Sequence, residues 1–320
     1  MTGRPVRGRR IPTHNVAGWM EPMLATLVEA LPDSRGWLFE RKLDGIRALA
    51  YRDRRGDRLY SRNKLPLEES FPSIADALGR LDRDRFVLDG EIVAVVKGNA
   101  AGFEALQQSS GRTPLRYYVF DVLSLDGRDL RRLPLVERKR LLRAIPLSGR
   151  LRRTTTRKGD AEALRSEACE TGWEGLIAKR SDSPYEEGRS RSWLKLKCVN
   201  EQELVVGGFT DPKGSRVGFG ALLIGYHEKG ELRFAGEVGT GFSEKTLREL
   251  AAKLRRLQTE RSPFADHPRA RKGQHFVKPA LVAQVAFTEW TRDGKLRHPR
   301  FLGIRTDKKP AEVVRERPRR

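Results

Sequence analysis

Short apolar runs alternate with polar turn residues through most of the chain. Two of these runs, Trp37 to Phe39 and Ala48 to Tyr51, flank a segment that contains Lys42 and the pair Asp44-Gly45. Because an Asp-Gly pair between apolar runs is typical of the tight turn between antiparallel strands, a β-hairpin is predicted here. Lys42 would lie at its edge, either as a solvated surface residue or as a reactive amine.

Segments in which apolar residues recur at every second position predict further strands, and segments in which they recur about every 3.6 positions predict helices. The expected strands lie at residues 59–63, 86–94, 116–125, 172–180 and 193–197, and the expected helices at residues 71–81, 135–145 and 161–171. Alternation places Asp89 and Glu91 on one face of their strand, and likewise Lys195 and Lys197. The arginines of the second helix are expected to face solvent.

After Asn200 the pattern changes to short strands punctuated by glycine, with one helical period from Ser243 to Leu257. Such a pattern is typical of a small β-barrel of the OB kind. With 320 residues the chain is long enough for two domains. We expect their boundary near Asn200.

The net charge of the chain indicates the kind of partner that it binds. Lys and Arg number 64 against 42 Asp and Glu, a net charge of +22 that favours a polyanion such as nucleic acid. The excess is dense between Arg128 and Arg157, and both chain ends resemble flexible basic tails that could contact phosphate. The alternative is a surplus of arginine that is merely solvated.

The two cysteines, Cys169 and Cys198, are too few for a disulfide framework or a four-cysteine zinc site, so an intracellular protein is expected. The basic N-terminus is followed by no long apolar stretch, which argues against a secretory signal and a membrane anchor.

The candidate site residues lie at the ends of predicted strands and in predicted turns. The charged residues there are Lys42, Arg62, Glu91, Glu174, Lys179, Lys195 and Lys197. Carboxylates can hold a divalent cation, and cationic side chains can neutralise phosphate oxygens during phosphoryl or nucleotidyl transfer. Lys42 could act as a nucleophile if Arg41 and Arg47, a metal or burial lowered its pKa. Taken singly, each of these carboxylates and lysines is more typical of a surface ion pair.

Six segments in order resemble the motifs of the covalent nucleotidyltransferases, the superfamily of ATP-dependent DNA ligases, RNA ligases and mRNA-capping enzymes. They are Lys42-Leu43-Asp44-Gly45-Ile46-Arg47, Asp89-Gly90-Glu91, Tyr118-Val119-Phe120-Asp121, Glu174-Gly175-Leu176-Ile177-Ala178-Lys179, Trp193-Leu194-Lys195-Leu196-Lys197 and Arg305-Thr306-Asp307-Lys308. The residues of these segments are most similar to those of bacterial ligases of the end-joining kind, such as the ligase domain of ligase D or a stand-alone relative. Arg41 departs from the apolar residue or proline of many relatives.

The resemblance implies an α+β fold. Residues 1–199 would form an ATP-grasp-like nucleotidyltransferase (adenylation) domain with mostly antiparallel sheets, and residues 200–320 an OB-fold barrel. It also implies ATP and a divalent metal, Mg or Mn, as cofactors. Nicked or broken double-stranded DNA would be the partner of a monomeric, cytoplasmic, nucleoid-associated protein that could also meet end-joining proteins.

By the same resemblance, Lys42 would form a lysyl-AMP, pass AMP to the 5′-phosphate at a break and so allow the 3′-hydroxyl to seal the strand. The resemblance also implies a role for each remaining site residue: Glu40 near the adenine, Phe120 stacked on it, Glu91 at the ribose hydroxyl or the metal, Arg47 and Arg62 at the ribose, phosphates or 5′ end, Glu174 at the metal, Lys195 and Lys197 at the α-phosphate, and Arg305, Asp307 and Lys308 at the pyrophosphate.

Two alternatives stay open on the residues alone. An RNA ligase or capping-type enzyme would share these motifs. A non-enzymatic, basic OB-containing protein that binds nucleic acid would share the charge but would not need the ordered acids and lysines. A NAD-dependent ligase fits less well, because the chain lacks four zinc-binding cysteines.

Overall fold

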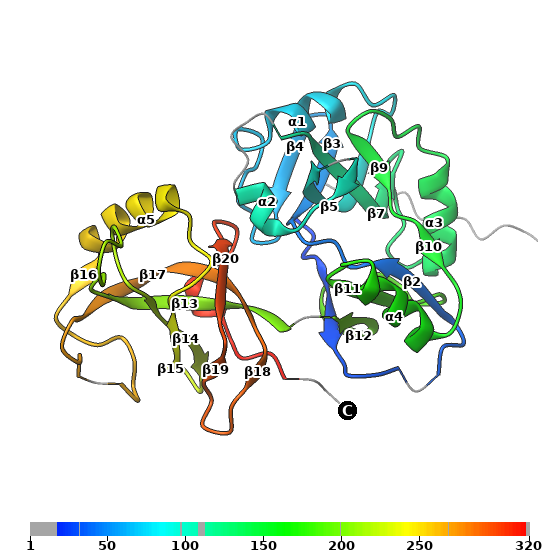
Figure 1. The fold of residues 1–320 in the computed structure, drawn as a ribbon. Helices are drawn as coiled ribbons and strands as arrows, with labels where there is room; N and C mark the ends of the chain where they lie inside the picture. The colour runs from blue at the N-terminus through cyan, green and yellow to red at the C-terminus, as the bar shows by residue number, and fades with distance from the viewer. Residues whose placement is uncertain are drawn as a thin grey trace, which may run out of the picture.

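The computed structural model describes residues 18–31, 33–96, 98–107, 113–198, 200–267 and 269–317. Two lobes lie beside each other (Figure 1). The N-terminal lobe, residues 18–198, contains two sheets, and the C-terminal lobe, residues 200–317, is built on a third large sheet. Helix and strand together give the expected α+β class.

The first sheet has five strands in the order β1-β12-β11-β2-β10. These are β1 (Met23–Leu27), β2 (Trp37–Arg41), β10 (Thr156–Arg157), β11 (Gly175–Arg180) and β12 (Gly188–Lys197). β1 and β12 run parallel, and the other neighbours are antiparallel. Helix α4 (Ala161–Glu170) packs Leu164 and Ala168 against Phe39 and Leu176 of this sheet.

The second sheet has seven strands along the path β4-β3-β5-β7-β8, with β6 added to β5 and β9 to β7. Their bounds are β3 (Ile46–Asp53), β4 (Gly56–Ser61), β5 (Phe86–Val96), β6 (Asn99–Ala100), β7 (Leu115–Leu125), β8 (Arg128–Asp129) and β9 (Leu151–Arg153). Three helices accompany them: α1 (Pro72–Gly79), α2 (Phe103–Gln107) and α3 (Leu135–Arg143). Ile74 and Leu78 of α1 are buried in the core of this sheet, as the helical period predicts.

The predicted hairpin around Asp44-Gly45 is wrong. β2 pairs with β10 and β11 in the first sheet, whereas β3 pairs with β4 and β5 in the second. Lys42 therefore lies on a link between two sheets. Gly45 is needed for close approach, because a Cβ there would collide with the carbonyl oxygen of Ile92.

The C-terminal lobe is the expected OB-fold barrel. Its strands are β13 (Asn200–Thr210), β14 (Leu222–Glu228), β15 (Glu231–Val238), β16 (Gln258–Thr259), β17 (Gln274–Phe287) and β20 (Arg300–Ile304), beside the small ribbon of β18 (Glu289–Trp290) and β19 (Leu296–Arg297). The sheet order β15-β14-β13-β17 continues to β20, and a bridge from Thr240 to Arg300 connects the two ends. Ser243 caps the N-terminus of helix α5 (Glu244–Arg256), because its side chain accepts a hydrogen bond from the amide of Thr246. The 3-10 turn η1 spans Pro310–Glu312.

Helix α3 corrects one expectation. Its arginines were expected to face solvent, but Arg138 is buried, together with Lys139 and Leu142. The Arg138 guanidinium forms two hydrogen bonds with the Asp121 carboxylate, at 2.9 and 3.0 Å. The ion pair explains a charge in the core, since a buried charge requires a partner. Part of the basic stretch is therefore structural.

The two cysteines form a disulfide, Cys169–Cys198, between the end of α4 and the end of β12. Their small number therefore says nothing about compartment. Within the described ranges, no helix is long and apolar enough to cross a membrane.

The basic tails are only partly described. The arginines before residue 18 and after residue 317 lie outside the described residues. The C-terminal segment does not match the expected flexible tail, because Arg315 stacks on Trp290 at 4.3 Å and Arg317 pairs with Glu228 at 2.9 Å.

Replacing Arg138 by Ala should lower the free energy of unfolding by about 3–5 kcal/mol, because the Asp121 carboxylate would stay buried without its partner. Urea unfolding followed by circular dichroism measures this. Arg140 is the matched control: its side chain is 68% exposed on the same helix, so Arg140→Ala should change stability by less than about 1 kcal/mol. Equal effects of the two variants would contradict a structural role for Arg138.

Candidate active site

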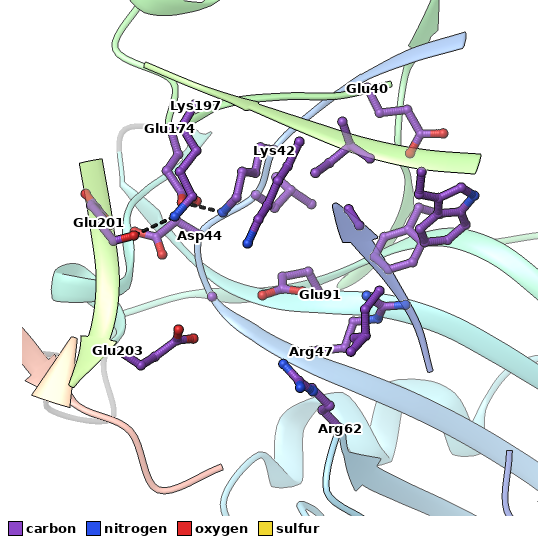
Figure 2. A pocket seen from close by; sticks show the side chains of 18 of the residues that line it. Glu40, Lys42, Asp44, Arg47, Arg62, Glu91, Glu174, Lys197, Glu201 and Glu203 are labelled. Atoms are coloured by element: carbon purple, nitrogen blue, oxygen red, sulfur yellow. Dashed lines mark hydrogen bonds and ion pairs between the residues drawn. The ribbon is translucent and has the colours of Figure 1, made fainter. Parts of the chain in front are cut away.

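A cavity of about 200 Å³ lies between the lobes. Side chains from β2, β3, β5, β7, β11 and β12 line it on one side, and side chains from β13, β17 and the segment after β20 line it on the other. The structure brings together every sequence-predicted site residue here: Glu40, Lys42, Arg47, Arg62, Glu91, Phe120, Glu174, Lys195, Lys197, Arg305, Asp307 and Lys308. Their convergence from twelve positions across the chain makes one composite site. Figure 2 shows part of this set, with Glu40, Lys42, Arg47, Arg62, Glu91, Glu174 and Lys197 labelled.

Lys42 follows β2 directly, and its amide donates to the carbonyl of Gly175 at 2.9 Å. Its ammonium forms an ion pair with Glu174. Burial disfavours the charged amine, but Glu174, Asp44 and Glu91 outweigh burial and raise the pKa of Lys42 above its usual value. In this state Lys42 is held as an ammonium.

The arginines expected to lower that pKa contact other groups. Arg41 donates to the carbonyl of Ala100 at 2.8 Å and stacks on Trp173 at 5.0 Å. Arg47 forms two 2.6 Å hydrogen bonds with Asp89. Of the three possible causes of a lowered pKa, burial is the one found at Lys42, and its acidic neighbours outweigh it in this structure.

Three carboxylates form a group that fits a divalent cation. One oxygen each from Asp44, Glu174 and Glu201 lies within 4.8 Å of the other two. Burial, followed by repulsion from Glu174 and Asp44, raises the pKa of Glu201 to about 7. Crowded carboxylate oxygens of this kind suit Mg or Mn. Glu174 was predicted as a metal ligand, whereas Asp44 and Glu201 were not.

Glu91 lies across the cavity from this group in Figure 2. Its pKa rises to about 7 because burial outweighs the opposing charges of Arg47, Arg305 and Lys42. Arg47 passes over the ring of Phe120 at 4.6 Å. Phe120 is 8% exposed and also contacts Trp193, so the ring belongs to the core and to the cavity wall at once.

Glu40 is buried between two lysines. Lys139 of α3 forms an ion pair with it, and Lys179 donates to it at 3.1 Å. Although burial opposes ionisation, these two cations lower the pKa of Glu40 to about 2. The Lys179 ammonium lies 4.3 Å from the ring centre of Phe120 and 4.0 Å from that of Trp193. This end of the cavity combines aromatic rings with a carboxylate of fixed charge.

The C-terminal lobe contributes three charged residues after β20. Arg305 forms two hydrogen bonds with Asp307, at 2.9 and 2.8 Å, and stacks on Phe103 of α2 at 4.4 Å. Lys308 pairs with Glu203 at 3.0 Å. The side chain of Asn63 donates to the Asp307 carbonyl at 3.0 Å, which joins the lobes directly. The structure therefore has the lobes closed over the cavity.

Lys195 and Lys197 lie on one face of β12, as alternation predicts, and both contact Glu316. No local pattern predicts this contact, since Glu316 lies between Arg315 and Arg317 near the C-terminus. Asp44 could have been found from its place within the first motif. Glu201 follows the lobe boundary and has no motif around it.

Comparisons with known proteins agree with this geometry. The family model for the ATP dependent DNA ligase domain matches residues 22–197, and the model for the ATP dependent DNA ligase C terminal region matches residues 215–308. The multifunctional non-homologous end joining DNA repair protein LigD of Mycobacterium tuberculosis is 41% identical over 304 residues, which are 93% of this chain and 40% of that protein. LigD of Pseudomonas aeruginosa is 39% identical over 312 residues, 94% of this chain and 37% of the relative.

A solved structure described as mycobacterial DNA ligase D complexed with ATP and MES is 39% identical, with a TM-score of 0.68 over 93% of this chain and 98% of that one. The chain thus spans about 40% of the length of the LigD relatives and nearly all of that solved ligase. One family model covers more than half of the chain, and a second covers most of the C-terminal lobe. The chain therefore belongs to the ATP-dependent DNA ligases, a family of covalent nucleotidyltransferases.

Proposed function

We propose that this protein seals breaks between a 5′-phosphate and a 3′-hydroxyl in DNA, with Lys42 as the nucleophile that becomes adenylylated. The observation that carries the proposal is the position of Lys42 in a closed cavity, where acids and further cations surround one amine. A protein that only bound DNA would need the surface charge but not this buried arrangement.

In the first step, the Lys42 amine attacks the α-phosphorus of ATP, and the bond to pyrophosphate breaks. A phosphoramide bond forms, and the amine loses its protons to solvent. An oxygen of the 5′-phosphate at the break then attacks the phosphorus of the lysine-bound AMP, which forms a phosphoanhydride, breaks the bond to nitrogen and regenerates the Lys42 amine. Attack by the 3′-hydroxyl joins the strand and releases AMP.

The proposed roles of the other residues follow the charges of the cavity. Phe120 and Glu40 lie at the end suited to adenine, and Glu91, Arg47 and Arg62 lie where ribose and phosphates would pass. Lys195 and Lys197 would neutralise the α-phosphate. The closed C-terminal lobe would place Arg305, Asp307 and Lys308 at the pyrophosphate.

We propose that Asp44, Glu174 and Glu201 hold Mg or Mn. A divalent cation there would stabilise charge on the phosphate oxygens. Glu174 would then no longer be the sole partner of the Lys42 ammonium. Because Glu174 is the strongest of the charges that raise the pKa of Lys42, its engagement elsewhere would favour the neutral amine that the reaction requires.

The wider setting is inferred from the LigD relatives, whose names place them in non-homologous end joining and DNA repair. We propose that this protein acts as a monomer in the bacterial cytoplasm, at the nucleoid, on nicked or broken double-stranded DNA. End-joining proteins would be its partners. The change of sheet between β12 and β13 supports a domain boundary near residue 200.

Replacing Lys42 by Ala should abolish transfer of labelled AMP from α-labelled ATP to the protein, because the nucleophile is missing. A denaturing gel measures the labelled band, and nicked DNA should remove the label from the unmodified protein. Lys245→Ala is the control, since that side chain is 79% exposed on α5. A labelled Lys42→Ala protein would refute the assignment, and faster sealing of a matched RNA nick would point to an RNA ligase.

Glu174→Gln and Glu201→Gln should each weaken Mn binding by about tenfold or more, because each removes one anionic oxygen ligand. Titration followed by electron paramagnetic resonance of free Mn measures the affinity without turnover. Glu91→Gln provides the comparison within the same cavity. Weaker binding in Glu91→Gln, with Glu201→Gln unchanged, would replace Glu201 by Glu91 in the metal group.

A further inference from the structure

The chain ends in a short segment that runs back across the C-terminal lobe and enters the cavity. The amide of His227 donates to the carbonyl of Val313 at 2.7 Å, and the side chain of Gln202 donates to the carbonyl of Val314 at 3.1 Å. The Gln202 side chain also accepts from the amide of Glu316 at 3.0 Å. These bonds hold residues 313–316, here called the C-terminal strap, against β13 and β14.

The Glu316 carboxylate extends from the strap to the two lysines of β12. One oxygen lies 2.5 Å from the Lys195 ammonium, and the other lies 3.3 Å from the Lys197 ammonium. All three side chains are at most 20% exposed. Lys195 and Lys197 lower the pKa of Glu316 to about 2 despite burial, so the group is an anion at neutral pH.

Glu316 therefore places two anionic oxygens on the two cations that the proposed function gives to the α-phosphate. A carboxylate and a phosphate compete for such a site, because both satisfy ammonium groups through negatively charged oxygens. We propose that Glu316 is an internal competitor of the nucleotide phosphate, which occupies the Lys195 and Lys197 site in the empty protein and is expelled when a nucleotide binds. This inference rests on the proposed function for the identity of the ligand.

Competition between Glu316 and a phosphate for the two lysines would also change a contact between the two lobes. Lys195 and Lys197 belong to the N-terminal lobe, whereas Glu316 is fixed to the C-terminal lobe. Their ion pairs therefore tie the two lobes together across the cavity. A phosphate on the lysines breaks this tie, so lobe closure in the nucleotide-bound protein would depend on the remaining contacts between the lobes, such as the hydrogen bond from Asn63 to the Asp307 carbonyl.

Glu316→Gln removes the charge and keeps the shape of the side chain. In this variant AMP should bind about tenfold more tightly, as expected if the carboxylate fills the site for about nine-tenths of the time in the original protein. Adenosine lacks the phosphate that competes with the carboxylate, so its affinity should change less than about twofold. Isothermal titration calorimetry with the full chain, free of bound adenylate, measures both ligands.

Glu312→Gln is the matched control, because Glu312 lies four residues earlier, faces solvent and pairs with Lys309 at 3.9 Å. It makes the same change in net charge and should leave both affinities unchanged. Equal AMP affinity in Glu316→Gln and the original protein would overturn the inference, as would an equal gain for adenosine. Binding of neither ligand to any variant would instead overturn the proposed function and, with it, the inference.

Discussion

Pairing of buried charges is the constraint on which the site depends. Lys42 faces Glu174, Arg47 faces Asp89, and Arg305 faces Asp307. A charge removed from water is stable only beside an opposite charge. A charged ligand that enters such a cavity must therefore exchange partners with side chains that are already paired.

The same pairing explains why the site needs two lobes. The N-terminal lobe alone would leave Lys195 and Lys197 without Glu316. Closure also brings Glu201 beside Asp44 and Glu174, where repulsion between like charges adds to burial in raising the pKa of Glu201. It also stacks Arg305 of the C-terminal lobe on Phe103 of the N-terminal lobe.

Sequence reasoning predicted most strands, the barrel and twelve residues that line the cavity, since alternation and motif order are local properties. It failed where a contact joins distant segments. The hairpin at Gly45 was wrong because close approach to Ile92, rather than a turn, requires the glycine. The inward position of Arg138 could not be predicted, because its partner Asp121 lies on another element. Glu316 sits among arginines and has no local pattern to mark it.

The parallel pairing of β1 with β12 has a consequence for synthesis of the chain. β1 can pair only after its neighbour β12, residues 188–197, has been synthesised. In the same way, β2 can pair with β11 only after residues 175–180 have been synthesised. Pairings between segments so far apart form slowly, because a long loop must close first. During synthesis the first sheet can be completed only after residue 197 has emerged from the ribosome, so earlier intermediates expose the unpaired edge of β2.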